Sequence, residues 1–506
     1  MDTLRSFVEN GQPVAGAAPW PHALIDRASW LELAGLLEHR RFTLVALWSD
    51  EELVHAAVLD ADAGEAAILG IACAGGRYPS LGRLHPPAIR PERALRDLSG
   101  IEPDGLPDTR PWLDHGRWPA RHPLAGTSAD ALPVQPVAYK FLPVKGESLH
   151  EIPVGPVHAG IIEPGHFRFT ASGETVVRLE ERLGYVHKGI ESLMTGQGVE
   201  RGATLAARVC GDSTVAYSLA FARAVEAAQA LDVPPRAVWL RALMAELERL
   251  ANHFGDVGAI CNDAAFPMMH AQCALLRERV LRASEVCFGH RLMMDRVMPG
   301  GVRVDLAGGG RAVLKALLTR IREDFPELVE LYDNTASLQD RTVGTGSLTP
   351  ALALQFGAGG YVGRASARHF DARRLPGYAP YQQLSFEVPV LEDGDVNARV
   401  WIRVREIEQS TALIEQILAG LPDGPLANAG AAGAGPGEGA ALVEGFRGDI
   451  FVSLRLAADG RIARCHLRDP SWFQWPLLEA VIEGNIVADF PLCNKSFNCS
   501  YSGHDL

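Results

Sequence analysis

The sequence predicts an α+β protein, in which a small N-terminal α+β domain precedes a mainly helical large domain. Residues 29–39 space their apolar side chains at helical period, and strand-like runs follow at 42–48, 52–59 and 66–73. From about 175 to 335 the periodicity is helical. A helix followed by a meander of strands is typical of a small α+β domain, and 506 residues are too many for one hydrophobic core.

Ser29 is the expected N-cap of the first helix, because its hydroxyl can accept a hydrogen bond from an unpaired backbone amide. Proline becomes dense through 107–136, which favours an extended connection over packed structure. We therefore predict an N-terminal domain at 1–125, a linker at 126–150 and a large domain at 151–506.

Within the large domain, residues 239–254 carry a broad apolar stripe at helical spacing, which predicts a helix. The stretch 199–231 has few charges and many alanines, which predicts a long helix buried on most sides. Residues 423–439 are rich in glycine and alanine and are predicted to form a flexible loop. Strand-like runs and a C-terminus rich in Trp and Phe follow.

Composition excludes several classes of function. A formal net charge of -13 argues against a nucleic-acid-binding or anionic-membrane surface. The chain has no run of about 18 apolar residues, so any membrane link is expected to run through partner subunits. Its eight cysteines include no C-x-x-C pair, so no metal site is predicted, and buried reduced thiols are expected.

Several segments, in order, resemble the large subunit of group 4 [NiFe] hydrogenases (hydrogenase-3, hydrogenase-4 and formate hydrogenlyase type) and the homologous 49-kDa-type subunit of complex I. These segments are 155–174, 180–191, 208–218, 295–306, 341–350 and 468–506. Upstream, residues 91–108 are similar to the 30-kDa-type complex I subunit, which is fused to the large subunit in formate-hydrogenlyase-type proteins. The resemblance covers almost the whole chain and implies the same fold: an α+β domain, then a mainly helical domain with a β portion near its start.

The resemblance also implies a set of partners. A small iron–sulfur subunit, similar to the 20-kDa subunit of complex I, would hold a 4Fe–4S cluster facing a cavity near Glu191 and Cys210. A ferredoxin-like iron–sulfur subunit and antiporter-like membrane subunits would complete the assembly. The chain would then lie peripherally on the cytoplasmic face of a membrane and bind no cofactor itself, except for a possible quinone.

The motifs that hold nickel and iron in the family are broken here. The first retains Cys210 but has Ser213 at its second cysteine position, and the second has Ser471 and Gln474 in place of both cysteines. Nickel and iron in such a site need several soft thiolates, which a serine hydroxyl or a neutral amide cannot replace. We therefore expect no NiFe centre and no H2 chemistry.

The quinone-binding pair of complex I is not evident either. Ile162 stands at the position of its histidine, while His158 matches the neighbouring histidine of the same loop. The position of its tyrosine falls near Ala207.

Six polar positions are candidates for a catalytic role on this resemblance, and Cys210 and His187 are candidates for contact with a cofactor. The six are Glu191, His158, Arg208, Asp212, Arg447 and Asp469. Glu191 matches a glutamate that passes protons beside the metal in hydrogenases, and burial can raise a carboxylate pKa toward neutrality. The alternative for Glu191 is a surface residue that stabilises a helix start.

Arg208 and Asp212 lie four residues apart, so a continuous helix would pair them, and we expect a buried pair lining the former metal cavity. Arg447 matches an arginine that overhangs the metal in hydrogenases, with a strand-edge arginine as the alternative. Asp469 is expected to pair with one of the arginines. Cys210 is expected to be a buried thiol rather than a nucleophile, since no base can be assigned to it.

Two functions remain open from the sequence. The first is a subunit of a redox complex in which electron transfer, with a quinone as one possible acceptor, drives ion movement. The second is a non-catalytic platform that retained the hydrogenase fold, with its cavity filled by Trp472, Phe473 and Trp475. An open pocket would favour the first reading.

Overall fold

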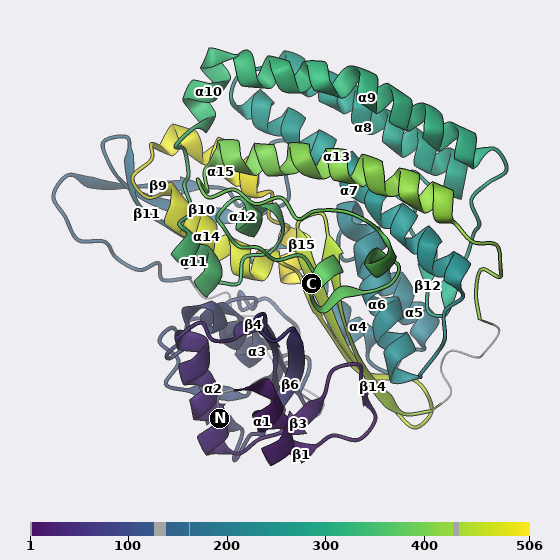
Figure 1. The fold of residues 1–506 in the computed structure, drawn as a ribbon. Helices are drawn as coiled ribbons and strands as arrows, with labels where there is room; N and C mark the ends of the chain where they lie inside the picture. Colours follow the sequence, from purple (N-terminus) through teal and green to yellow (C-terminus); the bar gives the residue numbers. More distant parts are fainter. Residues whose placement is uncertain (1–2, 126–137, 161, 429–434) are drawn as a thin grey trace.

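The structure is a computed structural model that describes residues 3–125, 138–160, 162–428 and 435–506. Figure 1 shows the N-terminal domain below a helical body, with the β9–β11 sheet projecting to one side. None of the described helices combines the length and apolar character needed to cross a membrane. The α+β fold expected from the sequence is confirmed.

The N-terminal domain is built on a five-stranded sheet in the order β1-β3-β6-β5-β4. Its strands are β1 (Gln12–Pro13), β3 (His22–Leu24), β4 (Thr43–Asp50), β5 (Leu53–Asp60) and β6 (Glu65–Ala72), with β7 (Arg77–Pro79) and β8 (Glu102–Asp104) forming a second, small sheet. Its helices are α1 (Leu4–Asn10), α2 (Arg27–Glu38) and α3 (Ile89–Ser99). The expected helix and three strands are therefore all present.

The cap of α2 differs from the prediction. Asp26 is the N-cap, and its carboxylate accepts a hydrogen bond from the backbone amide of Ser29. Ser29 therefore lies inside the first turn and supplies a donor rather than the capping acceptor. Asp and Ser serve equally well as N-caps, so residue type alone could not choose between them.

The large domain begins with an antiparallel sheet in the order β11-β10-β9, as the resemblance implied. Its strands are β9 (Leu149–Val154), β10 (His166–Ser172) and β11 (Thr175–Arg182). Part of the proposed linker, residues 126–137, lies outside the described residues. The other end of that linker already belongs to β9.

Long helices form the body of the large domain (Figure 1). They are α6 (Thr214–Ala228), α7 (Pro235–Asp263), α8 (Pro267–Phe288), α9 (Gly310–Asn334) and α13 (Val396–Gly420). Shorter helices are α4 (Ile190–Met194), α5 (Val199–Ala206), α10 (Ala336–Thr342), α11 (Pro350–Gln355), α12 (Gly360–Arg364), α14 (Ser471–Ile482), α15 (Phe490–Phe497) and α16 (Tyr501–Asp505). The helix predicted at 239–254 is confirmed as part of α7, which packs between α8 and α13.

The single helix expected over 199–231 is interrupted. Helix α5 ends at Ala206, Cys210 is extended, and a 3-10 turn at Gly211–Ser213 precedes α6. Glycine is a poor helix former because it loses the most backbone entropy, so Gly211 is the weak point of the stretch. The break turns Arg208 and Asp212 in different directions, which decides the geometry of the site.

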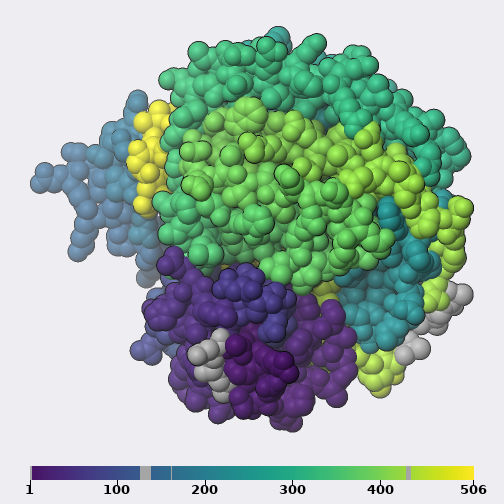
Figure 2. Space-filling view, in the orientation of Figure 1, coloured from purple at the N-terminus to yellow at the C-terminus, as the bar shows by residue number. Residues whose placement is uncertain are grey.

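A four-stranded sheet joins the two domains. Its order is β16-β15-β14-β2, with β14 (Gly437–Gly445), β15 (Gly448–Leu456), β16 (Ile462–Arg468) and the N-terminal β2 (Ala17–Ala18). Strand β2 pairs in parallel with β14, so the N-terminal domain contributes a strand to the large domain. Figure 2 shows the N-terminal residues lying directly against the large domain on this face.

Strand β14 also corrects the loop predicted at 423–439, whose residues 429–434 lie outside the described part of the chain. Gly437 and Gly439 belong to β14 and pack against α6. A Cβ at Gly439 would stand only 1.9 Å from the carbonyl oxygen of Ala224, so glycine permits the close approach of strand and helix. A hairpin of β12 (Val297–Met298) and β13 (Gly301–Val302) also packs against α6, and the amide of Gly300 in its turn donates to Glu226.

Candidate functional site

The remains of the metal-binding motifs meet where four segments converge. These are the turn between α5 and α6, the β14–β15 turn, the start of α14 and the segment leading into α16. At the centre, the guanidinium of Arg447 donates from Nη1 to Oδ1 of Asp212 at 2.7 Å and pairs with the second carboxylate oxygen through Nη2. Arg447 is buried, because the β14–β15 turn directs it into the interior.

The Arg447–Asp212 pair keeps both groups charged. Burial tends to raise the pKa of the Asp212 carboxyl, but the neighbouring Arg447 outweighs burial, and the net pKa of Asp212 lies below its usual value. For Arg447, burial tends to lower the pKa, but the neighbouring Asp212 has the larger effect, so the net pKa lies above the usual value. The pair is therefore an ionised, bidentate contact, the strongest geometry available to an arginine.

The Cys210 thiol lies against this pair. It donates to Oδ1 of Asp212 at 2.7 Å, and the hydroxyl of Ser500 donates to its sulfur at 3.2 Å. Burial, reinforced by the charge of Asp212, raises the Cys210 pKa to about 12. The sulfur is therefore a neutral thiol, because burial and the neighbouring carboxylate both disfavour the thiolate.

The other three former ligand positions are engaged in hydrogen bonds. Ser471 Oγ accepts from the backbone amide of Ser500 at 2.8 Å. The side-chain amide of Gln474 donates to the carbonyl oxygens of Gly359 and Arg447, at 3.1 and 2.9 Å. Ser213 Oγ accepts from Arg447 at 3.2 Å.

Asp469 does not pair with an arginine, contrary to expectation. Its Oδ2 accepts from the hydroxyl of Tyr217 at 2.6 Å, and its Oδ1 accepts from the backbone amide of Ser471 at 2.9 Å. Asp469 therefore shapes the start of α14 through neutral donors. Arg447 faces Asp212 instead, so it is not available to Asp469.

The expected Arg208–Asp212 pair is also wrong. Arg208 instead forms a bidentate contact with Asp295, with Nη2 donating to Oδ2 at 2.7 Å. Both side chains are substantially exposed, at 41% for Arg208 and 36% for Asp295. Because the helix ends before Arg208, the four-residue spacing no longer places it above Asp212.

An open cleft of about 500 Å³ lies beside the Cys210 cluster. It is lined by His158, Ile162, Glu163, Cys210, Arg447 and Tyr501, among others. His158 lies in this cleft as expected, with Nε2 2.8 Å from the carbonyl oxygen of Gly165. Such a volume falls within the range typical of small-molecule sites.

Tyr501 is the site residue that sequence reasoning missed. Its side chain is buried, and its hydroxyl, near Asn494, makes no hydrogen bond of good geometry with the described residues. A buried hydroxyl without a hydrogen-bond partner destabilises the protein. A ligand in the cleft that accepts a hydrogen bond from Tyr501 would therefore be favoured. The sequence around Tyr501 carries no spacing that could have signalled this role.

In the non-catalytic alternative, three aromatic residues would fill the former metal cavity. These residues, Trp472, Phe473 and Trp475, do not line this cleft. Phe473 packs into the core of the N-terminal domain, and Trp472 stacks on His504 with ring centroids 4.0 Å apart. Trp475 packs against Tyr501, with its indole donating to the carbonyl oxygen of Ser500. Trp475 therefore supports a wall of the cleft, whereas Trp472 and Phe473 line a different cavity.

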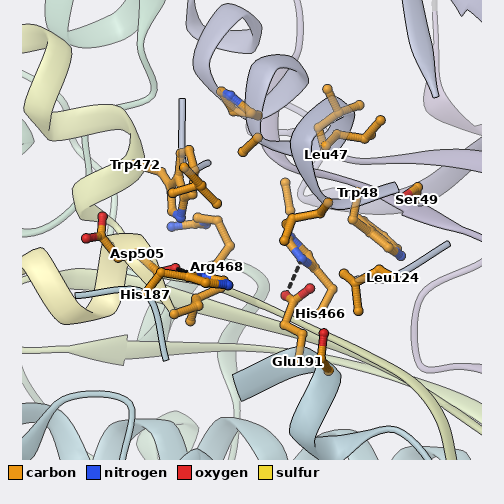
Figure 3. A pocket seen from close by; sticks show the side chains of 18 of the residues that line it. Leu47, Trp48, Ser49, Leu124, His187, Glu191, His466, Arg468, Trp472 and Asp505 are labelled. Atoms are coloured by element: carbon orange, nitrogen blue, oxygen red, sulfur yellow. Dashed lines mark hydrogen bonds and ion pairs between the residues drawn. The ribbon is translucent and has the colours of Figure 1, made fainter. Parts of the chain in front are cut away.

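Glu191 lies in a different cavity, between the two domains (Figure 3). This cavity holds about 40 Å³, room for a few water molecules, and Glu191 is not among the residues that line the Cys210 cleft. Its Oε1 lies 2.8 Å from Nδ1 of His466 and accepts from the amide of Leu467, while Oε2 lies 2.8 Å from Nη1 of Arg464. The expectation that Glu191 and Cys210 share a cavity is therefore wrong.

The charge of Glu191 also differs from expectation. Burial tends to raise its pKa, but Arg464 and His466 outweigh burial and lower the pKa of Glu191 to about 2. A carboxylate held so strongly in the ionised form is unsuited to accept and release protons near pH 7. His466 also stacks on Trp48 of β4, with ring centroids 5.2 Å apart, so the cluster connects the domains.

The remaining candidate, His187, and the adjacent Lys188 support the loop that precedes α4. His187 lies with Nδ1 2.6 Å from the carbonyl oxygen of Asp505 and stacks on Trp118. Lys188 donates from Nζ to the carbonyl oxygen of Val209 at 2.6 Å. Through Lys188 this loop fixes the backbone immediately before Cys210.

Comparisons with known families match three parts of the chain. Residues 264–436 match the family described as respiratory-chain NADH dehydrogenase, 49 Kd subunit. Residues 188–255 match nickel-dependent hydrogenase, and residues 25–128 match the 30 Kd subunit of respiratory-chain NADH dehydrogenase.

Individual relatives extend the similarity over most of the chain. Formate hydrogenlyase subunit 5 of Escherichia coli is 32% identical over 85% of this chain and 77% of its own length. The carbon monoxide-induced hydrogenase of Rhodospirillum rubrum is 32% identical over 69% of this chain and 98% of its own length. Among solved structures, a chain of a membrane-bound sulfane sulfur reductase, an archaeal respiratory membrane complex, is 27% identical with a TM-score of 0.67, covering 72% of this chain and 100% of its own.

Proposed function

Because this chain belongs to the family of group 4 hydrogenase and complex I 49-kDa-type large subunits, with a fused 30-kDa-type domain, we propose that it is the large subunit of a membrane-associated redox complex without NiFe chemistry. In this proposal, electrons reach an acceptor in the Cys210 cleft from an iron–sulfur partner. The observation that carries the proposal is an open cleft beside a closed, hydrogen-bonded remnant of the metal site.

The donor set at the remnant does not fit nickel and iron. One former ligand position carries a thiol with a pKa of about 12, and the others carry two hydroxyls and an amide. Cys499, the other nearby thiol, also has a raised pKa, chiefly because it is buried. Soft-metal sites need thiolates, and the Arg447 guanidinium, whose Nη1 lies 3.8 Å from the Cys210 sulfur, places positive charge beside the position where a cation would have to bind.

The first expected result is therefore a negligible nickel content. The purified protein should carry well below one nickel per chain by elemental analysis, and the assembled complex should show no H2-dependent dye reduction. A nickel-containing relative, produced in the same host and medium, is the control for metal supply. About one nickel per chain together with H2-dependent activity would contradict the proposal.

The cleft supports a role in reducing an acceptor other than protons. Two electrons from the partner's 4Fe–4S cluster and two protons would convert a bound quinone to a quinol. The Tyr501 hydroxyl is available to donate a hydrogen bond to one oxygen of such an acceptor, and His158 lines the same cleft. The related solved structure, whose title describes a sulfane sulfur reductase, indicates that the fold also serves acceptors other than protons.

The family suggests the remaining parts of the assembly. A small iron–sulfur subunit would pack beside the cleft, a ferredoxin-like subunit would supply it with electrons, and antiporter-like membrane subunits would move ions. The chain would sit on the cytoplasmic face, held there by these partners. Exposed Val157 and Ile162, close to the mouth of the cleft, offer apolar surface for such a partner.

The alternative is a platform that binds the same partners but performs no redox chemistry at the cleft. Tyr501→Phe separates the two readings. Because the hydroxyl has no partner of good geometry, its removal should leave the free energy of unfolding unchanged or raise it, while kcat/KM for acceptor reduction falls about tenfold. Chemical denaturation and quinone-reductase assays of the assembled complex measure the two effects.

The control for this test is Tyr185→Phe. Tyr185 is a partly exposed tyrosine that packs against His115 and is not among the residues that line the cleft. It should alter neither quantity. Unchanged acceptor kinetics in Tyr501→Phe would favour the platform.

A further inference from the structure

A third cavity, remote from the Cys210 cleft, contains an arginine whose charge has no counterpart. Arg223 lies on α6, with its guanidinium carbon 4.8 Å from the ring centroid of Tyr378. Its Nε is buried without a hydrogen-bond acceptor, and the guanidinium forms no hydrogen bond or ion pair with the described residues. Two fully buried arginines differ in this respect: Arg364 pairs with Glu406 and Glu444, and Arg399 donates to main-chain carbonyls.

The nearest carboxylate is already engaged. Glu226, one helical turn beyond Arg223, forms a two-point contact with Arg241 and accepts from the backbone amide of Gly300 at 2.8 Å. Glu226 and Arg241 therefore neutralise each other. The hydroxyl of Tyr381 donates to Glu246, and that of Tyr378 accepts from the amide of Glu444. The cavity is left with one net positive charge, that of Arg223.

The space around Arg223 is large enough for a ligand. The cavity measures about 340 Å³ and lies between α6, α7, the turn at 378–381 and strand β14. Apart from the charged and tyrosine side chains, its walls are apolar, with Leu219, Val238 and Ala242 among them. Arg223 remains partly exposed, so a molecule in solution can reach it.

An unpaired cation in such a place is expensive. Burial lowers the pKa of Arg223, and the opposing influences of Tyr378 and Glu226 do not offset burial. Buried charges in proteins are generally paired, and an unpaired one calls for a ligand or a functional explanation. A bound anion would supply the missing partner without any change in the fold.

We propose that this cavity binds a small organic monocarboxylate, with its carboxylate on the Arg223 guanidinium and its hydrocarbon part against Leu219, Val238 and Ala242. A single negative charge matches the single uncompensated positive charge. The planar guanidinium suits a carboxylate, to which it can donate two parallel hydrogen bonds. The apolar walls favour a molecule with a hydrocarbon tail over a small, strongly hydrated anion.

The test uses sodium hexanoate as the probe and the full-length chain in the assembly in which it purifies. Hexanoate should bind in isothermal titration calorimetry and raise the thermal unfolding temperature. Hexanol, which has the tail without the charge, hexylamine, which reverses the charge, and inorganic phosphate, which lacks the tail, should each have much weaker effects. Failure of hexanoate to bind at millimolar concentration would overturn the proposal.

Two variants test the assignment to this cavity. Arg223→Met removes the charge but keeps a long side chain, so it should weaken hexanoate binding roughly 30-fold or more, while the unliganded protein unfolds at the same or a higher temperature. Ala227→Leu keeps the charge and fills the cavity from α6, so it should also weaken binding. Binding that survives unchanged in both variants, or a lower unfolding temperature of unliganded Arg223→Met, would place the ligand elsewhere or show that Arg223 is structural.

Discussion

Replacing Arg447 with methionine should lower the free energy of unfolding by about 3 kcal/mol. The change keeps the apolar stem but leaves the Asp212 carboxylate without its bidentate partner, and breaking a buried pair in this way typically costs about 3–5 kcal/mol. We expect a value at the lower end of this energy range because 33% of the Asp212 side chain is exposed. Water can therefore solvate part of the unpaired carboxylate. Urea unfolding at pH 7 measures the loss.

The matched control is Arg208→Met, which removes an arginine from an exposed ion pair with Asp295. Exposed pairs are worth roughly 0–1 kcal/mol, so this variant should be nearly as stable as the parent protein. If Arg208→Met costs as much as Arg447→Met, the buried Arg447–Asp212 pair is not the organising contact of the site.

Glu191→Gln should cost roughly 3 kcal/mol at pH 7, the free energy that corresponds to lowering the Glu191 pKa from 4.5 to about 2. The amide keeps the shape of the side chain, but it removes the negative charge that faces both Arg464 and His466. Glu200→Gln on the exposed surface of α5 should change stability by less than about 0.5 kcal/mol and serves as the control.

The pH dependence of this effect has a defined sign. Because folding depresses the pKa of Glu191, its contribution is fully present above the unfolded pKa near 4.5 and is lost as the pH falls toward 2. The stability gap between parent and variant should therefore be constant from pH 7 to about pH 5 and narrow below it. A gap that persists unchanged at pH 3 would show that the loss does not come from the ionised carboxylate. A variant that loses redox activity with no loss of stability would favour the proton-relay interpretation.

The sequence was informative wherever a pattern was local. The strand-like apolar runs of β4, β5 and β6 and the helical stripe of α7 depend on neighbouring residues, and both predictions are confirmed. The motif order likewise identified the segments that meet at the site. The resemblance also supplied Arg447, Cys210 and His158 as members of the site, although it did not supply their partners.

Most errors about the site came from contacts between distant parts of the chain. Arg447 and Asp212 are 235 residues apart, and the pairing of Glu191 with Arg464 and His466 spans a similar distance. Arg464 and His466 are two residues apart on β16, so their side chains lie on the same face of the strand. This spacing could have marked them as a charged pair, but nothing in the neighbouring sequence indicates which residue they contact. For Arg208 a local signal was present: Gly211 lies inside the supposed helix, whose regular geometry is interrupted between Ala206 and Thr214.

The parallel pairing of β2 with β14 bears on how the molecule could be divided. Cutting the chain between its two domains would leave the outer edge of β14 without the backbone partner that Ala17 and Ala18 provide. An uncovered strand edge offers free amide and carbonyl groups to any extended segment it meets, which promotes self-association. The fused N-terminal domain thus covers the edge of β14 and protects it from pairing with other chains. A large domain produced by itself would need another form of protection, such as a lysine introduced on β14 or a short added peptide that pairs with this strand.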